Sequence, residues 1–183
     1  MRVVISMLLA SLFLFAFNPF KYPREKVVID SRYFSKLEKQ LSALNENQKW
    51  VLESVYRKCL KYDLGNTCVA IAWQESYFGT YKVVPWTGDY GVMGINLYWF
   101  FMDNGLNYKN PYLRSKWATK LVEDDDYTVM YAVAKLLKLK QKYKSWIEVW
   151  AHYNGGSRPN YWYAKQILNK IYIFRKIILK EVK

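Results

Sequence analysis

The chain has 183 residues, 52% of them apolar, and a formal net charge of +13. This length and apolar content suit one domain with a hydrophobic core. A single histidine and two cysteines cannot form a structural zinc site without carboxylate ligands, so no metal and no other cofactor are expected. The positive charge comes without zinc-finger spacing, an RNP-like strand or a phosphate-binding glycine loop, which argues against a nucleic-acid partner.

The N-terminal segment has the pattern of an export signal. Residues 3–17 form a mostly apolar run of 15 behind Arg2, which suits a signal-peptide h-region better than a membrane span. No Ala-x-Ala pattern marks a cleavage site near Ala16, so an uncleaved N-terminal anchor is the alternative. We expect residues 1–30 to be leader and spacer. Residues 31–183 are expected to form one domain that is exported to the periplasm or cell envelope.

Helical patterns dominate the first part of that domain. Residues 33–44 are amphipathic, and Asn45 with a glutamine three residues later resembles a capping box that begins a helix ending near Gly65. The pair at 66–67, Asn-Thr, is then expected to cap a short helix. We expect Gly79 to close that short helix.

Two cysteines lie where these two helices meet. In an exported protein, Cys59 and Cys68 could form one disulfide bond. The alternative is that they are two small apolar residues that pack in neighbouring helices. The sequence leaves this choice open.

The rest of the chain contains one irregular segment and several helices. Residues 80–96 are rich in glycine, proline, threonine and aspartate and include two β-favouring valines, which predicts an irregular loop or small hairpin. Further helices are predicted over residues 97–103, from Asn110 onwards, after the acidic cluster at 123–126, over 146–153 and over 161–180. The expected fold is therefore mainly α, with a small insert after the short helix that ends near Gly79.

Positive charge is concentrated in the C-terminal part of the chain. From Val133 onwards there are 12 Lys or Arg residues against two acids. Such a field favours an anionic partner, for example an acidic polymer of the cell envelope bound by the C-terminal helices. The alternative is a solvated helix face.

Glu75 is the candidate catalytic residue. It lies near the end of the short apolar helix, among the aromatic residues Trp73, Tyr77 and Phe78. The negative end of the helix dipole and the loss of hydration both disfavour a charged carboxylate there and are expected to raise its pKa. A carboxylic acid that is still protonated near neutral pH can protonate a glycosidic oxygen.

Three short motifs follow one another at a characteristic spacing. They are Glu-Ser at 75–76, Gly-Val-Met-Gly-Ile at 91–95 and Ala-His-Tyr-Asn-Gly-Gly at 151–156. This order resembles the soluble lytic transglycosylase family, which shares the lysozyme-like fold. In that family a Glu-Ser ends the catalytic helix, a Gly-Leu-Met-Gln-Ile segment follows, and an Ala-Tyr-Asn-Ala-Gly segment comes last. The resemblance covers residues 67–168.

Other positions both extend and limit the resemblance. Asp124 and Tyr127 match the family's Asp-x-x-Tyr helix start. Gly94 stands where the family usually has glutamine, so a substrate-facing amide is missing. His152 replaces a residue that is usually small, and we expect it to pack or cap. The insert has Trp-Thr-Gly-Asp-Tyr at 86–90 in place of the family's Ser-x-x-Gly-Ala-x-Gly, which is closer to phage-like or specialised members.

The resemblance implies a peptidoglycan lytic transglycosylase. Glu75 would protonate the oxygen of the β-1,4 bond between N-acetylmuramic acid and N-acetylglucosamine, and would then accept the proton of the muramoyl C6 hydroxyl as a 1,6-anhydro ring closes. Tyr153 is the candidate that orients Glu75 through its hydroxyl. The residues expected to shape the sugar site are Ser76, Tyr90, Met93, Asn96 and Asn154. Trp86 either stacks on a sugar ring or packs in the core, and the chain is expected to act as a monomer.

Three alternatives remain open. In a hydrolase of the goose-type lysozyme kind, a loop carboxylate would hold the attacking water, and Asp89 is the acid placed to do so. A lysozyme-like domain that binds peptidoglycan without cleaving it is the second alternative, although such a module gains nothing obvious from a desolvated acid at Glu75. A nucleic-acid binder, the third, is favoured by the positive charge alone.

Overall fold

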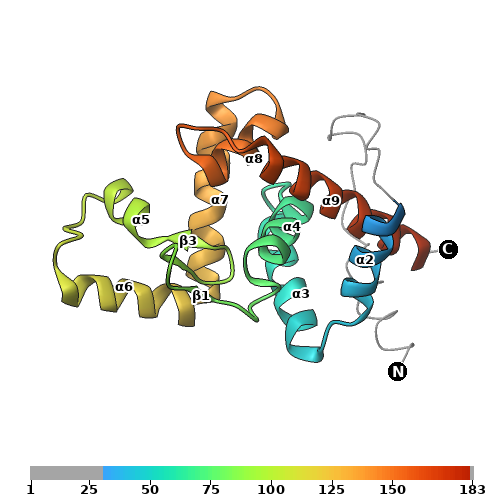
Figure 1. Cartoon of the computed structure of the whole chain (residues 1–183), viewed down its shortest axis with the longest axis horizontal. Helices are drawn as coiled ribbons and strands as arrows, with labels where there is room; N and C mark the ends of the chain where they lie inside the picture. Colours follow the sequence, from blue (N-terminus) through green and yellow to red (C-terminus); the bar gives the residue numbers. More distant parts are fainter. Residues whose placement is uncertain (1–30, 182–183) are drawn as a thin grey trace. The chain divides into compact units, whose positions relative to one another are not determined.

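The computed structural model describes residues 31–181. The expected leader at residues 3–17 and its cleavage or use as an anchor lie outside the described residues. The described chain is mainly helical, with eight helices and a small antiparallel sheet, as the sequence predicts (Figure 1). None of the helices in this range is long and apolar enough to cross a membrane.

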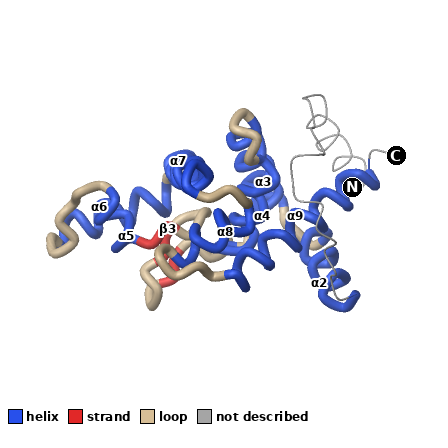
Figure 2. Tube along the Cα trace, turned by 90° about the horizontal axis from the view of Figure 1, so that it is seen from above, coloured by secondary structure: helices blue, strands red, loops and turns tan. Residues whose placement is uncertain are grey.

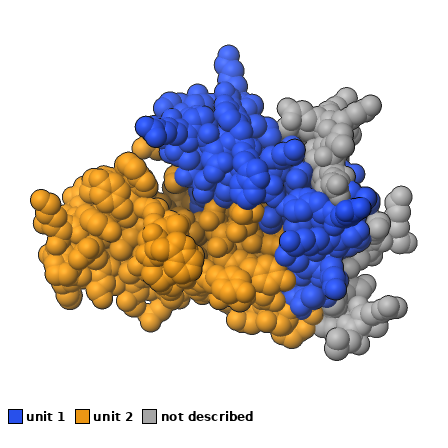
Figure 3. Space-filling model, viewed as in Figure 1, with its two compact units in different colours: residues 1–44, 139–183 blue, residues 45–138 orange. Residues whose placement is uncertain are grey.

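The described residues fall into two compact units, shown in different colours in Figure 3. Residues 45–138 form unit 2, and residues 31–44 with 139–181 belong to unit 1. Unit 2 contains α3 (Glu46–Leu60), α4 (Gly65–Ser76), β1 (Val83–Val84), β2 (Asp89–Tyr90), β3 (Ile95–Asn96), α5 (Leu97–Asp103), α6 (Pro111–Glu123) and most of α7 (Asp125–Lys142). Unit 1 contains α2 (Ser31–Ser42), α8 (Trp146–Gly155), α9 (Tyr161–Glu181) and the end of α7. The expected single domain over residues 31–183 stays a prediction.

The capping box that begins α3 is confirmed. The Asn45 side chain accepts a hydrogen bond from the Gln48 backbone N–H at 2.9 Å, and the Gln48 side chain accepts one from the Asn45 N–H at 2.9 Å. Cys59 in α3 and Cys68 in α4 form a disulfide bond, and both are fully buried. The sequence left open whether the two cysteines are bonded or only packed together, and in the structure they are bonded.

The expectation that Asn66 and Thr67 cap α4 is wrong. The helix already begins at Gly65, before both of these residues. Its N-cap is Leu64, which makes no side-chain hydrogen bond. A Cβ on Gly65 would lie 2.9 Å from the Tyr56 ring. The start of α4 is therefore set by its close approach to α3, and not by a capping oxygen.

The insert between α4 and α5 is a three-stranded antiparallel sheet in the order β1-β2-β3, drawn in red in Figure 2. Its registers pair Val84 with Asp89, and Asp89 with Asn96. The prediction of a small hairpin is confirmed, and a third strand extends it. Asn96 ends this sheet and also caps α5, because its side chain accepts a hydrogen bond from the Trp99 N–H.

The remaining helices begin and end close to the predicted positions. Helix α5 has the predicted bounds, and Pro111 opens α6 behind Asn110, whose side chain accepts from the Leu113 N–H. At the start of α7 the Asp124 carboxylate accepts from the Tyr127 N–H at 2.8 Å. Its bond with Lys120 is the main reason that the pKa of Asp124 is lowered. The Asp-x-x-Tyr pattern is thus a helix cap.

Helix α4 is the centre of the unit 2 core. Its residues from Thr67 to Trp73 are all buried, so the helix is apolar around its whole circumference. Gln74 and Glu75 are the first half-buried positions after this stretch. The fully buried stretch of α4 therefore ends at residues 74–75, where the candidate acid lies.

Candidate functional site

The chain leaves α4 through an unusual backbone. Ser76 is the last helical residue, and Tyr77 and Phe78 both have positive φ, +48° and +54°. The expectation that Gly79 closes the helix is therefore wrong, because Tyr77 is the left-handed cap and Gly79 follows it. A non-glycine residue in this conformation costs roughly 1–2 kcal/mol. Such strain persists where packing enforces it, and Phe78 is 1% exposed and stacks on Trp73.

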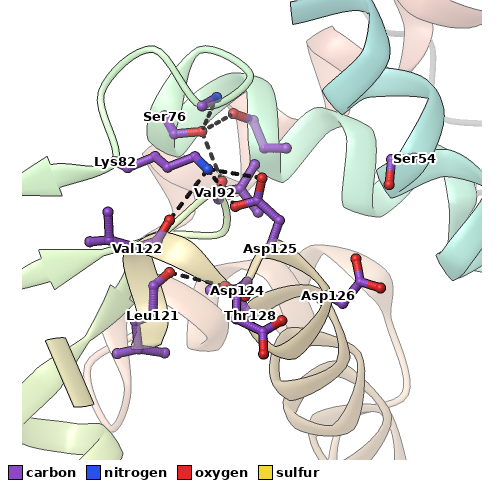
Figure 4. A network of polar contacts seen from close by, with 12 residues as sticks. Ser54, Ser76, Lys82, Val92, Leu121, Val122, Asp124, Asp125, Asp126 and Thr128 are labelled. Atoms are coloured by element: carbon purple, nitrogen blue, oxygen red, sulfur yellow. Dashed lines mark hydrogen bonds and ion pairs between the residues drawn. The ribbon is translucent and has the colours of Figure 1, made fainter. Parts of the chain in front are cut away.

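Ser76 joins two of the three sequence motifs. Its hydroxyl donates to the Val92 carbonyl at 2.9 Å and accepts from the Gly79 N–H at 2.9 Å (Figure 4). The spacing of 16 residues between the Glu-Ser and Gly-x-Met-x-Ile motifs is thus bridged by a direct hydrogen bond. Ser76 and Met93 are both fully buried. Both side chains are therefore packed inside unit 2, and the part predicted for them in a sugar site stays a prediction.

Glu75 lies against Gly94. A Cβ built on Gly94 would be 2.6 Å from Glu75 Oε2 and 2.9 Å from Glu75 Cβ. Gly94 has a φ of +60°, in the left-handed region that favours glycine. Any side chain at this position would meet Glu75, which explains why this chain has a glycine where the family that its motifs resemble has glutamine.

Gly94→Ala is expected to reduce activity more than stability. The new methyl group would have to displace Glu75, and a misplacement of about 1 Å near the chemistry can cost roughly 10²-fold in rate. The stability cost should exceed that of Gly105→Ala, a control with a φ of +63° and no atom within 4 Å of a new Cβ, but stay below that of Gly91→Ala, whose new Cβ meets a backbone carbonyl. Rates on purified peptidoglycan and urea unfolding of both variants would test this. Equal activity of the two variants would contradict the contact.

The junction of α6 and α7 contacts two segments near Glu75, the start of β1 and the glycine turn before β3. Lys82, just before β1, donates to the Val122 carbonyl at 3.3 Å and forms an ion pair with Asp125 at 2.7 Å (Figure 4). A Cβ on Gly91 would lie 2.2 Å from the Leu121 carbonyl oxygen. The glycine turn before β3 is therefore held directly on the α6–α7 junction.

The sheet fixes two further predicted site residues. The Asn96 side-chain amide donates to the Thr87 carbonyl at 2.8 Å and to Asp89 Oδ1 at 2.9 Å. Asp89 and Tyr90 are half-buried, on β2. Trp86, in the turn between β1 and β2, is 85% exposed. The alternative that Trp86 packs in the core is therefore wrong.

Lys135 is a residue of this region that the sequence analysis missed. It is half-buried on α7. Burial is the main influence on its pKa and lowers it, while three carboxylates act in the opposite direction, those of Asp103, Glu75 and Asp89. A signal was present in the sequence: Lys135 is two helical turns after Thr128, on the same face of the helix.

Tyr153 and Asn154 belong to unit 1 and are described there. Tyr153 is buried in α8, and its ring stacks on Tyr163 of α9 at 6.5 Å. Asn154 is exposed, and its side-chain oxygen accepts from Asn160 at 2.8 Å. The orientation of Glu75 by Tyr153 stays a prediction.

His152 packs and caps, as expected. Its ring stacks on Tyr143 at 4.0 Å, and its Nδ1 is 2.6 Å from the carbonyl oxygen of Gly156 at the end of α8. The imidazole of His152 thus contacts the end of its own helix on one side and the Tyr143 ring on the other.

The arrangement in unit 2 combines a half-buried glutamate, a strained helix end and a glycine turn that packs closely on the α6–α7 junction. Comparison of the chain with protein-family models, with curated proteins and with solved structures finds no match. A proposal about the function of this chain therefore rests on the three motifs and on the geometry around Glu75.

Proposed function

We propose that the chain is a peptidoglycan lytic transglycosylase of lysozyme-like fold, in which Glu75 serves as both acid and base. The single observation that supports this most is the position of Glu75. Glu75 is half-buried at the end of a buried helix, and its carboxyl group lies against Gly94. The hydrogen bond from Ser76 to Val92 links this helix end to the second motif of the resembling family.

The proposed reaction needs one carboxyl group. Glu75 donates its proton to the glycosidic oxygen as the bond from that oxygen to the muramoyl C1 breaks, leaving an oxocarbenium-like sugar. The Glu75 carboxylate then removes the proton of the C6 hydroxyl while O6 bonds to C1, which closes the 1,6-anhydro ring. No water is consumed. Most glycosidases instead need a second carboxylate at a defined separation.

A hydrolase is the second candidate, and one observation favours it. Asp89 pairs with Asn96 on β3, and Gly94, which Glu75 contacts, comes directly before that strand, so a second carboxylate belongs to the same part of unit 2. Against this, Asp89 Oδ1 already accepts a hydrogen bond from the Asn96 side-chain amide at 2.9 Å. An Asp89 oxygen held within the sheet in this way suits a structural role better than that of a base that activates water.

Partners and location belong to the same proposal. Glycan strands of peptidoglycan are the substrate, with Tyr90 and the exposed Trp86 as the aromatic surfaces for sugar rings. An exported monomer in the periplasm or cell envelope would meet this substrate. The lysines of the C-terminal helices would attract an anionic envelope polymer.

Product analysis tests the proposal. Purified sacculi are digested with residues 31–183, and the released muropeptides are analysed by mass spectrometry. Ends with a 1,6-anhydro ring are the expected result. Products heavier by one water would replace the transglycosylase with the hydrolase. Sacculi that bind the protein and stay intact would leave only a binding module.

A further inference from the structure

Three tryptophans of unit 2 are more than half exposed: Trp50, Trp86 and Trp99. Trp50 lies on α3, Trp86 lies in the turn between β1 and β2, directly before Thr87, and Trp99 lies in the first turn of α5. A single exposed aromatic ring is common and needs no ligand to explain it. Two rings whose segments are held together by the same polar side chain call for another explanation.

Asn96 joins the segments that carry two of these tryptophans. Its side-chain amide donates to the Thr87 carbonyl in the β1–β2 turn at 2.8 Å, and its side-chain oxygen accepts from the Trp99 N–H at 3.3 Å. The backbone adds a second link between the same segments, because the Leu97 N–H donates to the Gly88 carbonyl at 2.8 Å. The β1–β2 turn and the start of α5 therefore lie side by side.

The Trp99 ring is the outer end of a series of ring contacts that reaches the core. Trp99 meets the Tyr98 ring at 5.1 Å and an angle of 77°. Tyr98 in turn meets Tyr108 at 5.2 Å, and Tyr108 meets the fully buried Phe101 at 5.4 Å, both nearly at right angles. Such edge-to-face contacts favour one ring geometry. A perpendicular contact covers at most one face of a ring, so the other face of Trp99, which is 61% exposed, is open to a ligand.

This aromatic surface continues from the candidate acid. Glu75 lies against Gly94, which directly precedes β3, and β3 ends at Asn96, where α5 begins (Figure 1). The chain from Gly94 to Trp99 is five residues long, which spans at most about 18 Å when fully extended. A polymer with one sugar at Glu75 therefore reaches the exposed ring of Trp99 within a few sugars.

The charge of unit 2 favours a neutral polymer. Residues 45–138 contain 11 Lys or Arg and 10 Asp or Glu, so the large positive charge of the chain lies outside this unit. A nearly balanced charge provides no general attraction for nucleic acid or for an anionic lipid surface. The faces of Trp and Tyr rings suit the apolar C–H faces of sugar rings, because the sugar hydroxyl groups can stay in water at the edge of the contact.

We propose that Trp99 and Trp86 form one binding surface for a neutral β-1,4-linked glycan, which extends the site of Glu75 along the start of α5. The part of this surface in catalysis rests on the proposed function; its affinity for sugar does not. Trp99 would hold sugars on the α5 side of the bond that is cleaved. The loss of its ring should therefore weaken the binding of long glycans.

Titration with the hexamer of β-1,4-linked N-acetylglucosamine tests this surface without relying on cleavage. The full-length chain is labelled with ¹⁵N in the Glu75→Gln background, so that the probe is not consumed, and is followed by NMR. The indole N–H signals are assigned by changing single tryptophans to phenylalanine. The signals of Trp86 and Trp99 are expected to shift together with one dissociation constant, while the signal of Trp50 stays in place.

Trp99→Ala should raise the dissociation constant by about tenfold, because it removes the contact of one exposed ring. Trp99→Phe keeps a ring and should recover most of the affinity. Trp50→Ala is the matched control, since Trp50 is also 61% exposed and belongs to the same unit. This control should bind the hexamer as tightly as the parent protein.

The outcomes separate this surface from the proposed function. A loss of affinity in Trp99→Ala that is absent in Trp50→Ala supports the surface. No binding of the hexamer, a Trp99 signal that does not move, or an equal loss in both variants overturns it. The Trp99 signal of the parent protein decides the matter if Trp99→Ala does not fold. If Trp99 binds the hexamer but the wild-type protein leaves sacculi intact, the surface stands and the transglycosylase function fails; cleaved sacculi without a response at Trp99 would mean the reverse.

Discussion

Glu75→Gln is expected to lower the rate of glycan-strand cleavage by about 10²–10⁴-fold, the usual contribution of a general acid or base. Glutamine has nearly the same shape as glutamate and can keep the contact with Gly94, but its amide cannot donate the proton that the leaving oxygen needs. The loss should therefore be catalytic, with thermal unfolding close to that of the wild type. Release of soluble muropeptides from sacculi, followed over time, measures the rate.

Glu46→Gln is the matched control for this change. It makes the same substitution in the same unit, on the 85% exposed side chain of a surface ion pair with Lys49. Exposed ion pairs contribute little to stability, so this variant should cleave as fast as the wild type. Equal rates in Glu75→Gln and Glu46→Gln would refute the assignment of Glu75 as the acid.

The parts of the fold that the sequence predicted best are those decided within a few residues. Asn45 with Gln48, and Asn110 ahead of Pro111, fix helix starts through hydrogen bonds that span three positions. Asn104 and Gly105 end α5 in the same local way. Such signals need no knowledge of tertiary packing, and here they gave the right boundaries.

The boundaries of α4 could not be predicted in this way. Its start depends on the contact between Gly65 and Tyr56, and its end on two aromatic residues that packing holds in the left-handed region. Local rules favoured the asparagine and threonine at the start and the glycine at the end. The helix that carries the candidate acid is therefore the one whose ends are decided by tertiary contacts.

The candidate site shows the same division. Glu75 and Asp89 were identified from sequence because their residue types and neighbours suggest acid–base chemistry. The contact of Glu75 with Gly94 was not, because it depends on how segments distant in the chain pack. From the sequence Gly94 looked like a missing amide, whereas in the structure Glu75 occupies the space beside Gly94.

Gly91→Ala is expected to destabilise unit 2 more than any other glycine-to-alanine change in that unit. Gly91 has a φ of +79°, and its new Cβ would lie 2.2 Å from the Leu121 carbonyl oxygen and 2.6 Å from Thr128 Cγ2. Backbone strain and overpacking together should lower the free energy of unfolding by about 3–4 kcal/mol. Neither obstacle is the flexible end of a side chain, so the segment from Gly91 to Gly94 must shift.

Gly105→Ala separates these two costs, because it has a similar φ and open space around the new Cβ. It should lower the free energy of unfolding by about 1 kcal/mol. Urea unfolding of both variants gives the difference, which measures the overpacking alone. Because the shifted turn also carries the Val92 carbonyl that Ser76 binds, Gly91→Ala should lose cleavage activity even at temperatures where it stays folded. If the two variants unfold at the same urea concentration, the turn is not held on the α6–α7 junction, and the rigid support inferred for Glu75 is absent.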